Sequence, residues 1–223
     1  MSTRRTGYAI VGTLILASAV AFVHAEQLKL QRGPVGATRI TKHFSPVCRA
    51  GPACPASHLA LLRFRLRTGA RLELTLVDAA GATVRTFSPP GGRRYSPGLV
   101  KVYWNGRTDA RRPAPDGRYR LRVALVGNRT ITIPDPLILD TKPPRLRLLS
   151  APGRLPVRYA TNEDANVFLA VHPVAGGRTH ILRGHRGRVV VPAALVSTPA
   201  TLKLVAVDRA GNASPAVSAG TTG

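Results

Sequence analysis

The chain has 223 residues, 44% of them hydrophobic, and its 33 basic and 10 acidic residues give a formal net charge of +23. This length suits one large or two ordinary domains, and the hydrophobic fraction argues against disorder throughout. The charge predicts attraction to polyanions, but the basic residues are spread from end to end and the surplus of Ala, Gly, Pro and Arg is also typical of GC-rich coding, so no specific nucleic-acid partner is expected.

An uncharged run occupies residues 8–23, directly after two arginines. This order is typical of an export signal, and residues 23–25 would allow cleavage before Glu26. The run is also nearly long enough for one membrane-spanning helix. We therefore predict that residues 1–25 are a signal peptide or a single-pass anchor that makes the membrane a partner. Everything after them would lie outside the cytoplasm, either attached to the cell membrane or secreted.

Residues 26–37 are polar and contain Gly and Pro without a regular pattern, which is typical of a linker. Beyond it, Cys48 and Cys54 are the two cysteines of the chain. Outside the cytoplasm, a pair this close in sequence is most simply a disulfide. The rival interpretation, half of a metal site, lacks His or Cys partners at ligand spacing, so a disulfide is predicted.

Short runs of alternating apolar and polar residues follow, and period two predicts strands with one buried face. We expect a tight hairpin at 68–70 and a second turn at 78–81. The strands predicted for this first module are 62–66, 72–76, 83–87, 100–104, 119–125, 128–133 and 137–139.

The most distinctive stretch is Trp104-Asn105-Gly106-Arg107-Thr108-Asp109, followed by Pro115-Asp116-Gly117-Arg118-Tyr119. It places two sharp turns between two strands. Glycine permits positive φ, Asn and Asp cap turns through their side chains, and the two aromatic rings are expected to pack beneath. The predicted role of the stretch is structural. The motif residues are Trp104, Asn105, Gly106, Asp109, Pro115, Asp116, Gly117 and Tyr119.

This pattern resembles the FlgD-type immunoglobulin-like domain, a family named for the flagellar hook-capping protein and common in exported bacterial proteins. The segment 76–86 is similar to the same family's strand-turn-strand segment, so the resemblance covers residues 59–126. It implies an immunoglobulin-like β-sandwich. One departure is Arg111, which stands where the family usually carries Gly, so this turn must be remodelled or Arg111 must accept strain.

A stiff joint, Lys142-Pro143-Pro144, separates this module from a second series of strands. Their spacing of roughly ten residues also suggests a sandwich. We therefore predict an all-β protein with two tandem immunoglobulin-like modules, at 38–141 and 142–216, and a flexible tail at 217–223. The strands predicted for the second module are 146–149, 157–161, 167–172, 179–182, 188–191 and 202–207.

The segment 204–214 resembles the closing strand and turn of many bacterial immunoglobulin-like or fibronectin-like repeats. Asp208 and Asn212 could suggest calcium. An isolated pair cannot supply the six to eight oxygens that calcium takes, so we predict that both residues cap the turn.

Residues that carry chemistry are sparse. The sequence has no nucleophile elbow, zinc-protease helix, phosphate loop or dinucleotide glycine string, and its carboxylates form no obvious acid–base pair. His172, His180 and His185 could converge on zinc or copper, but surface positions are the default expectation. We predict no enzymatic activity, no cofactor and no metal.

Two strands carry arginines on the face opposite their apolar residues. If these strands were neighbours, they would form an arginine ladder that is either solvated or available to phosphate and carboxylate groups. The residues concerned are Arg63, Arg65, Arg67, Arg118, Arg120 and Arg122.

The leading functional hypothesis is a non-catalytic, membrane-tethered or secreted envelope protein whose modules act as spacer and interaction surface. Its partner would be an anionic envelope polymer or another surface protein. The alternative is a polyanion-binding surface protein for envelope polymers, acidic lipids or extracellular DNA. A flagellar assembly role would rest on fold analogy alone, which does not carry function.

Overall fold

The structure is a computed structural model that describes residues 18, 33–48, 54 and 58–222. The predicted signal or anchor, apart from Ser18, and residues 26–32 of the predicted linker lie outside the described residues. In the part that is described, no helix has the length and apolarity needed to cross a bilayer. Its regular structure is seventeen strands and one turn of 3-10 helix at Ala193–Leu195.

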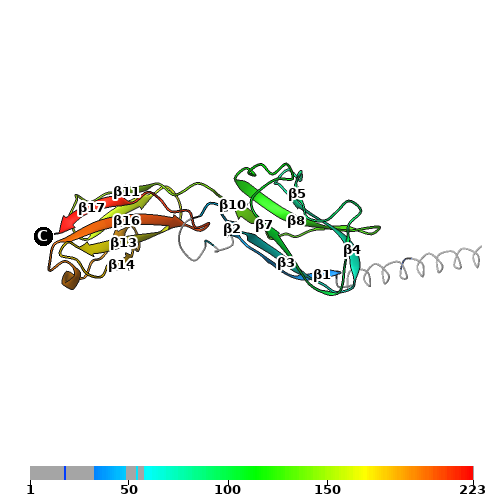
Figure 1. Cartoon of the computed structure of the whole chain (residues 1–223), viewed down its shortest axis with the longest axis horizontal. Coiled ribbons are helices and arrows are strands. Elements are labelled where there is room, and N and C mark those ends of the chain that lie inside the picture. The colour runs from blue at the N-terminus through cyan, green and yellow to red at the C-terminus, as the bar shows by residue number, and fades with distance from the viewer. Residues whose placement is uncertain (1–17, 19–32, 49–53, 55–57, 223) are drawn as a thin grey trace, which may run out of the picture.

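The first module is a sandwich of two sheets (Figure 1). One sheet has the order β1-β3-β7, and the other has the order β2-β10-β8-β4-β5, with β6 paired to β4 and β9 paired to β8. The bounds are β1 Val35–Ile40, β2 His43–Phe44, β3 Ala60–Leu66, β4 Ala70–Val77, β5 Thr83–Thr86, β6 Arg93–Tyr95, β7 Gly98–Trp104, β8 Gly117–Leu125, β9 Thr130–Thr132 and β10 Leu137–Leu139.

The predicted hairpin at 68–70 is wrong. Strands β3 and β4 do not pair: β3 lies between β1 and β7, whereas β4 pairs with β5, β6 and β8. The turn therefore carries the chain from one sheet to the other. Alternation along two successive strands has the same period in a hairpin and in a crossing between sheets, which is why the pattern did not distinguish them. The turn at 78–81 does join a paired hairpin, β4 with β5.

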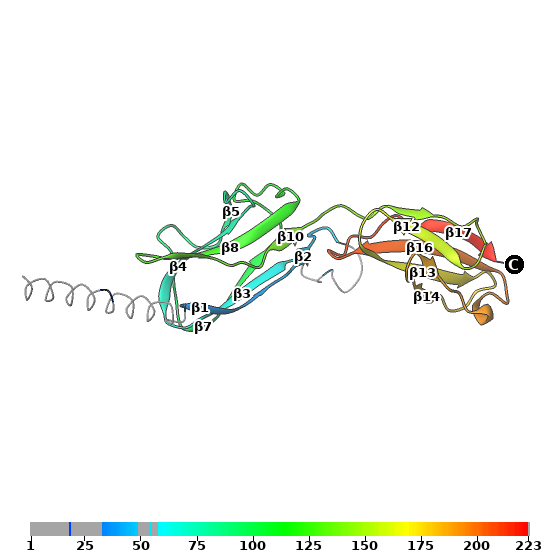
Figure 2. The same ribbon diagram turned by 180° about the vertical axis from the view of Figure 1, so that it is seen from behind.

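The second module is a sandwich of seven strands, three in one sheet and four in the other (Figure 2). The orders are β11-β12-β15 and β14-β13-β16-β17, and two antiparallel sheets with seven strands are the immunoglobulin-like arrangement. The bounds are β11 Leu146–Leu148, β12 Val157–Thr161, β13 Ala165–Pro173, β14 His180–Arg183, β15 Arg188–Val189, β16 Ala200–Asp208 and β17 Val217–Thr222.

Strand β17 occupies the stretch where a flexible tail was expected. It pairs antiparallel with β16, and Ala219 is a buried member of the second core. The segment contains Gly and Ala, which are depleted in strands, but also Val and Thr, which are enriched in them. It is held as a strand by pairing with β16 and by burial of Ala219, neither of which its composition indicates.

Each module has its own hydrophobic core. The first contains Trp104, Phe44 and Phe64 with aliphatic residues from both sheets, all between Val35 and Leu139. The second is mainly aliphatic and lies between Leu146 and Ala219. All the residues of these two cores come after Glu26 in the chain.

Candidate functional site

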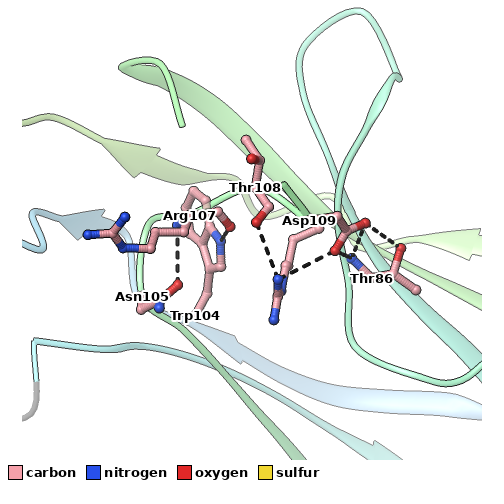
Figure 3. A network of polar contacts seen from close by, with 7 residues as sticks. Thr86, Trp104, Asn105, Arg107, Thr108 and Asp109 are labelled. Carbon is pink, nitrogen blue, oxygen red and sulfur yellow. Dashed lines mark hydrogen bonds and ion pairs between the residues drawn. The ribbon is translucent and has the colours of Figure 1, made fainter. Parts of the chain in front are cut away.

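The loop that follows β7 is closed by its own side chains (Figure 3). Trp104 is buried and stacks 5.0 Å from the Tyr119 ring and 6.1 Å from the Phe44 ring, measured between centroids. Its indole N–H donates to the Arg107 carbonyl at 2.8 Å, and the Asn105 side-chain oxygen accepts from the Arg107 N–H at 3.2 Å. These contacts satisfy the polar edge of the indole and the loop backbone, which is a structural use of both side chains.

Gly106 is required at its position for two reasons. Its φ is +75°, and a Cβ there would lie 2.9 Å from Cγ of Pro46. Gly117, in contrast, is not among the residues with positive φ and begins β8. The expectation that Gly117 provides positive φ is therefore wrong. The left-handed residue is Arg111, with φ +60°, so Arg111 does accept the strain that its replacement of Gly implied.

Asp109 ties the same loop to the neighbouring hairpin. Its carboxylate accepts hydrogen bonds from the backbone N–H and the hydroxyl of Thr86, both at 2.9 Å (Figure 3). The Arg85 guanidinium lies 3.5 Å away and also donates to the Thr108 carbonyl. Asp109 thus links β5 to the loop through hydrogen bonds.

The turn before β8 is a tyrosine corner. The Tyr119 hydroxyl donates to the Pro115 carbonyl, four residues upstream, near the start of a strand that enters the sandwich. Asp116 accepts from the Thr141 N–H at 3.0 Å and from its hydroxyl at 2.9 Å, which fixes the chain just after β10. Burial raises the pKa of Tyr119, as expected for a phenol used as a hydrogen-bond donor rather than a base.

Cys48 and Cys54 form the predicted disulfide. The expectation that no metal-type partner lies near them is wrong, because Nδ1 of His58 is 3.9 Å from Sγ of Cys48. His58 follows Cys54 by four residues, a spacing that the sequence contains and that could have been noticed. With both sulfurs in the disulfide, no thiolate is available to a metal.

The predicted six-arginine ladder does not form. Arg63 and Arg65 lie on β3, whereas Arg118, Arg120 and Arg122 lie on β8, and these strands belong to different sheets. Arg67 follows the end of β3. Arg122 also donates to the Gly81 carbonyl at 3.1 Å, so its guanidinium holds the turn between β4 and β5.

A different basic row does form, on the outer face of the β1-β3-β7 sheet. Arg39 is the register partner of Arg63, and Arg63 is the register partner of Lys101. Directly opposed side chains in an antiparallel pair lie about 4.5–5.5 Å apart at Cβ, and like charges there repel. We call Arg39, Arg63 and Lys101 the basic row. Sequence analysis missed it because Arg39 and Lys101 are distant from Arg63 in the chain and only strand register brings them together.

Two exposed apolar side chains flank the basic row on the same face. Leu99 is 52% exposed and is the register partner of Arg65, and Tyr103 is 54% exposed and is the register partner of Leu61. None of the three strands contains a carboxylate. Among the described residues, the two ion pairs join Arg85 with Asp109 and Arg209 with Asp164, so neither neutralises the row. The face combines cations with exposed apolar surface.

The joint between the modules is held by Asn212, which is 4% exposed and lies in the turn after β16. Its side-chain amide donates to the Asp140 carbonyl at 2.9 Å and to the Lys142 carbonyl at 3.4 Å. The same amide donates to the Asp208 carboxylate at 2.7 Å, and Asp208 accepts the Ala210 and Asn212 N–H groups at 2.8 and 2.9 Å. Turn capping by Asp208 is confirmed, whereas the Asn212 side chain does not cap its own turn and instead bonds the Asp208 carboxylate and the Asp140 and Lys142 carbonyls.

Three carboxylates meet at this joint. Oxygens of Asp140, Glu163 and Asp208 all lie within 4.8 Å of one another. Burial, followed by the charges of Asp140 and Asp208, raises the pKa of Glu163. Oxygen ligands of this kind suit a hard cation, but Asp208 already accepts three hydrogen bonds. The sequence pattern pointed to Asp208 alone, because Asp140 and Glu163 come near it only where the two modules meet.

The three histidines of the second module do not converge on a metal site within the described ranges. His172 exchanges a hydrogen bond with the Thr179 hydroxyl at 2.8 Å, and none of His172, His180 and His185 belongs to a group of three potential ligands there. Their side chains are at least partly exposed.

No family model matches the chain, and no curated protein matches it. Among solved structures, it is similar to the fibronectin(III)-like modules of Clostridium thermocellum CbhA, with 13% identity, a TM-score of 0.40, and coverage of 83% of this chain and 93% of that chain. It is also similar to the BSP domain of a biofilm-associated protein, with 12% identity and a TM-score of 0.31, covering 85% of this chain and 29% of that chain. Likenesses this weak carry no argument about family or function. The sandwich fold is assigned from the strand order itself, and the FlgD-type resemblance stays a prediction.

Proposed function

We propose that the chain is an exported, non-catalytic cell-envelope protein, tethered to the membrane by its N-terminal apolar run, whose two modules act as a spacer and an interaction surface. The observation that carries this proposal is the joint. One buried side chain, Asn212, donates to two carbonyls of the segment that leaves the first module. Two complete cores joined end to end by a hydrogen-bonded turn give a rod (Figure 1).

The polar clusters described above support a structural use of the loops. Asp109, Asp116 and Asp208 each accept hydrogen bonds that close a turn or connect segments. The disulfide supports an oxidising compartment, because such bonds persist outside the cytoplasm. These features favour a rigid scaffold over a reactive pocket.

Cell fractionation of the full chain, with N-terminal sequencing of the mature protein, tests the proposal. We expect both modules to be digested by protease added to intact cells, with the protein recovered from membranes if the apolar run is retained or from the medium if cleavage occurs before Glu26. Recovery from the cytosol, protected from the protease, would contradict the proposal.

A second candidate function is binding of a polyanion, and the basic row favours it. Three cations in register, on strands without carboxylates, are poorly compensated and would gain from an anionic partner. Retention on immobilised wall polymer or DNA should fall steeply between about 50 and about 200 mM salt. Retention that does not change with salt would exclude this candidate.

A further inference from the structure

The outer face of the β1-β3-β7 sheet has a composition that matches a lipid–water boundary. The basic row of Arg39, Arg63 and Lys101 crosses three strands. The exposed apolar residues Leu99 and Tyr103 lie on either side of Lys101 along β7, on the same face of the sheet. Cations attract anionic headgroups, while Tyr is favoured where one part of a side chain is in water and the other is in an apolar layer.

We propose that this face docks on an anionic phospholipid bilayer. The arginine and lysine heads would contact lipid phosphates, and Leu99 and Tyr103 would enter the headgroup region beside them. A soluble phosphodiester polymer shares the phosphate chemistry but offers no apolar layer, so the exposed leucine and tyrosine would gain nothing from it. The bilayer is therefore the occupant that uses every feature of the face.

The position of the face along the chain also fits a bilayer. Strand β1 is the first strand and an edge of its sheet, and eleven residues, 24–34, separate it from the apolar run that ends at Val23. Eleven residues span at most about 36–40 Å. If the apolar run stays in the membrane, as in the proposed function, the face is kept within reach of the lipid surface.

Docking would set the orientation of the first module and leave the second free. Lys101 and Arg39 are exposed and Arg63 is half-buried, and long basic side chains of this kind can cover a sheet with their stems while their charged heads stay in water. The second module follows the first beyond β10, and it is not part of the β1-β3-β7 face (Figure 2). It would remain available to other partners.

The test uses the chain from Glu26 onward, which contains both cores, in co-flotation with phosphatidylcholine vesicles that contain or lack phosphatidylglycerol. We expect binding only to the anionic vesicles, with release as salt rises. The triple variant Arg39→Gln/Lys101→Gln/Arg63→Gln should bind roughly a hundredfold more weakly, because each basic residue near an anionic surface contributes about fivefold.

Two further variants make the test specific. Arg118→Gln/Arg120→Gln/Arg147→Gln removes the same three charges from exposed positions off this face, and it should keep most of the binding. Leu99→Ser/Tyr103→Ser keeps all charges and should weaken vesicle binding several-fold, but should leave retention on inorganic polyphosphate unchanged. Circular dichroism of each variant should match the parent chain.

The proposal is overturned if the parent chain ignores anionic vesicles or if both triple variants lose binding equally, which would indicate general charge attraction. It is also overturned if Leu99→Ser/Tyr103→Ser has no effect, because a soluble phosphate polymer would then explain the row. The vesicle test does not depend on the membrane tether. If the full chain is found in membranes but the chain from Glu26 does not bind vesicles, the docking proposal fails and the proposed function stands.

Discussion

The same turn occurs once in each module, and the two copies have different roles. Asp78 and Asp208 each accept from the N–H groups two and four residues later, at 3.0 and 2.9 Å in the first module and at 2.8 and 2.9 Å in the second. Gly81 and Gly211 have φ of +84° and +87°. The sequences Val77-Asp78-Ala79-Ala80-Gly81-Ala82 and Val207-Asp208-Arg209-Ala210-Gly211-Asn212 therefore build one shape.

The last residue of the turn makes the difference. The first copy ends in Ala82, which is exposed, and the turn only reverses the chain between β4 and β5. The second ends in Asn212, whose amide reaches Asp140 of the preceding module and Lys142 of the joint. A local capping motif thus becomes part of a joint by the addition of one donor, which shows that turn chemistry contributes to the connection between the modules.

Because each module has its own core, a core substitution should destabilise one module alone, and this is the largest effect that we expect. Trp104→Ala removes a buried side chain that packs on Phe44 and Tyr119, which should cost about 3–5 kcal/mol of unfolding free energy. In calorimetry of the chain from Glu26, only the unfolding temperature of the first module should fall. Leu169→Ala, in the second core, is the matched control, and it should lower the other transition by about 2–5 kcal/mol. A single transition shifted by both variants would contradict independent cores.

The two turn aspartates should differ in their effect. Asp208 is 4% exposed and Asp78 is half-buried, so Asp208→Ala leaves its donors without partners in a dry site and should cost about 1–3 kcal/mol. Asp78→Ala should cost less, because water can replace the lost carboxylate. Urea denaturation of both variants measures this difference. Equal losses of unfolding free energy would mean that burial at the joint does not make the Asp208 hydrogen bonds more important than those of Asp78.

Asn212→Ala should loosen the joint while leaving both cores intact. We expect a loss of about 1 kcal/mol in the second module and a broader distance distribution in small-angle scattering. The reciprocal change, Ala82→Asn, introduces the same amide where the other module is absent, so it should leave the scattering unchanged. If Asn212→Ala scatters like the parent chain, the amide is not what sets the angle between the modules.

Glu163→Gln should give the smallest effect, and it should depend on pH. Burial and the charges of Asp140 and Asp208 raise the pKa of Glu163 in the folded chain, so the stability linked to its protonated form is present below the ordinary glutamate pKa of about 4.3 and is lost as pH rises through the folded pKa. The variant should therefore melt at a slightly higher temperature than the parent at neutral pH and at the same temperature in acid. A variant that is less stable at neutral pH would contradict this account of the joint.

Much of the fold could be predicted from the sequence because period-two alternation is a local signal. Strands such as β7 and β13 were expected from it, and so was the buried packing of Trp104. Pairing was less accessible: the turn at 68–70 leads to another sheet, and the basic row depends on the register of Arg39, Arg63 and Lys101. Strand β17 has mixed propensity and pairs with β16, a partner that its composition does not indicate.

The repeated turn, in contrast, was visible in the sequence as V-D-x-A-G-x in both modules. Its use at the joint was not, because that depends on which residues of the preceding module meet Asn212. The tyrosine corner was predicted only in part: Tyr119 was expected to pack beneath the turn, but the hydrogen bond from its hydroxyl to the Pro115 carbonyl depends on the shape of the folded turn.

The oxidation state of Cys48 and Cys54 in intact cells tests the central claim, export of a folded two-module chain, most directly. Thiol-specific alkylation of the full chain in denaturant, with and without prior reduction, measures this oxidation state without any change to the sequence. We predict that alkylation requires prior reduction, because the disulfide forms outside the cytoplasm. Two cysteines that are freely alkylated without reduction would contradict export and, with it, the envelope role.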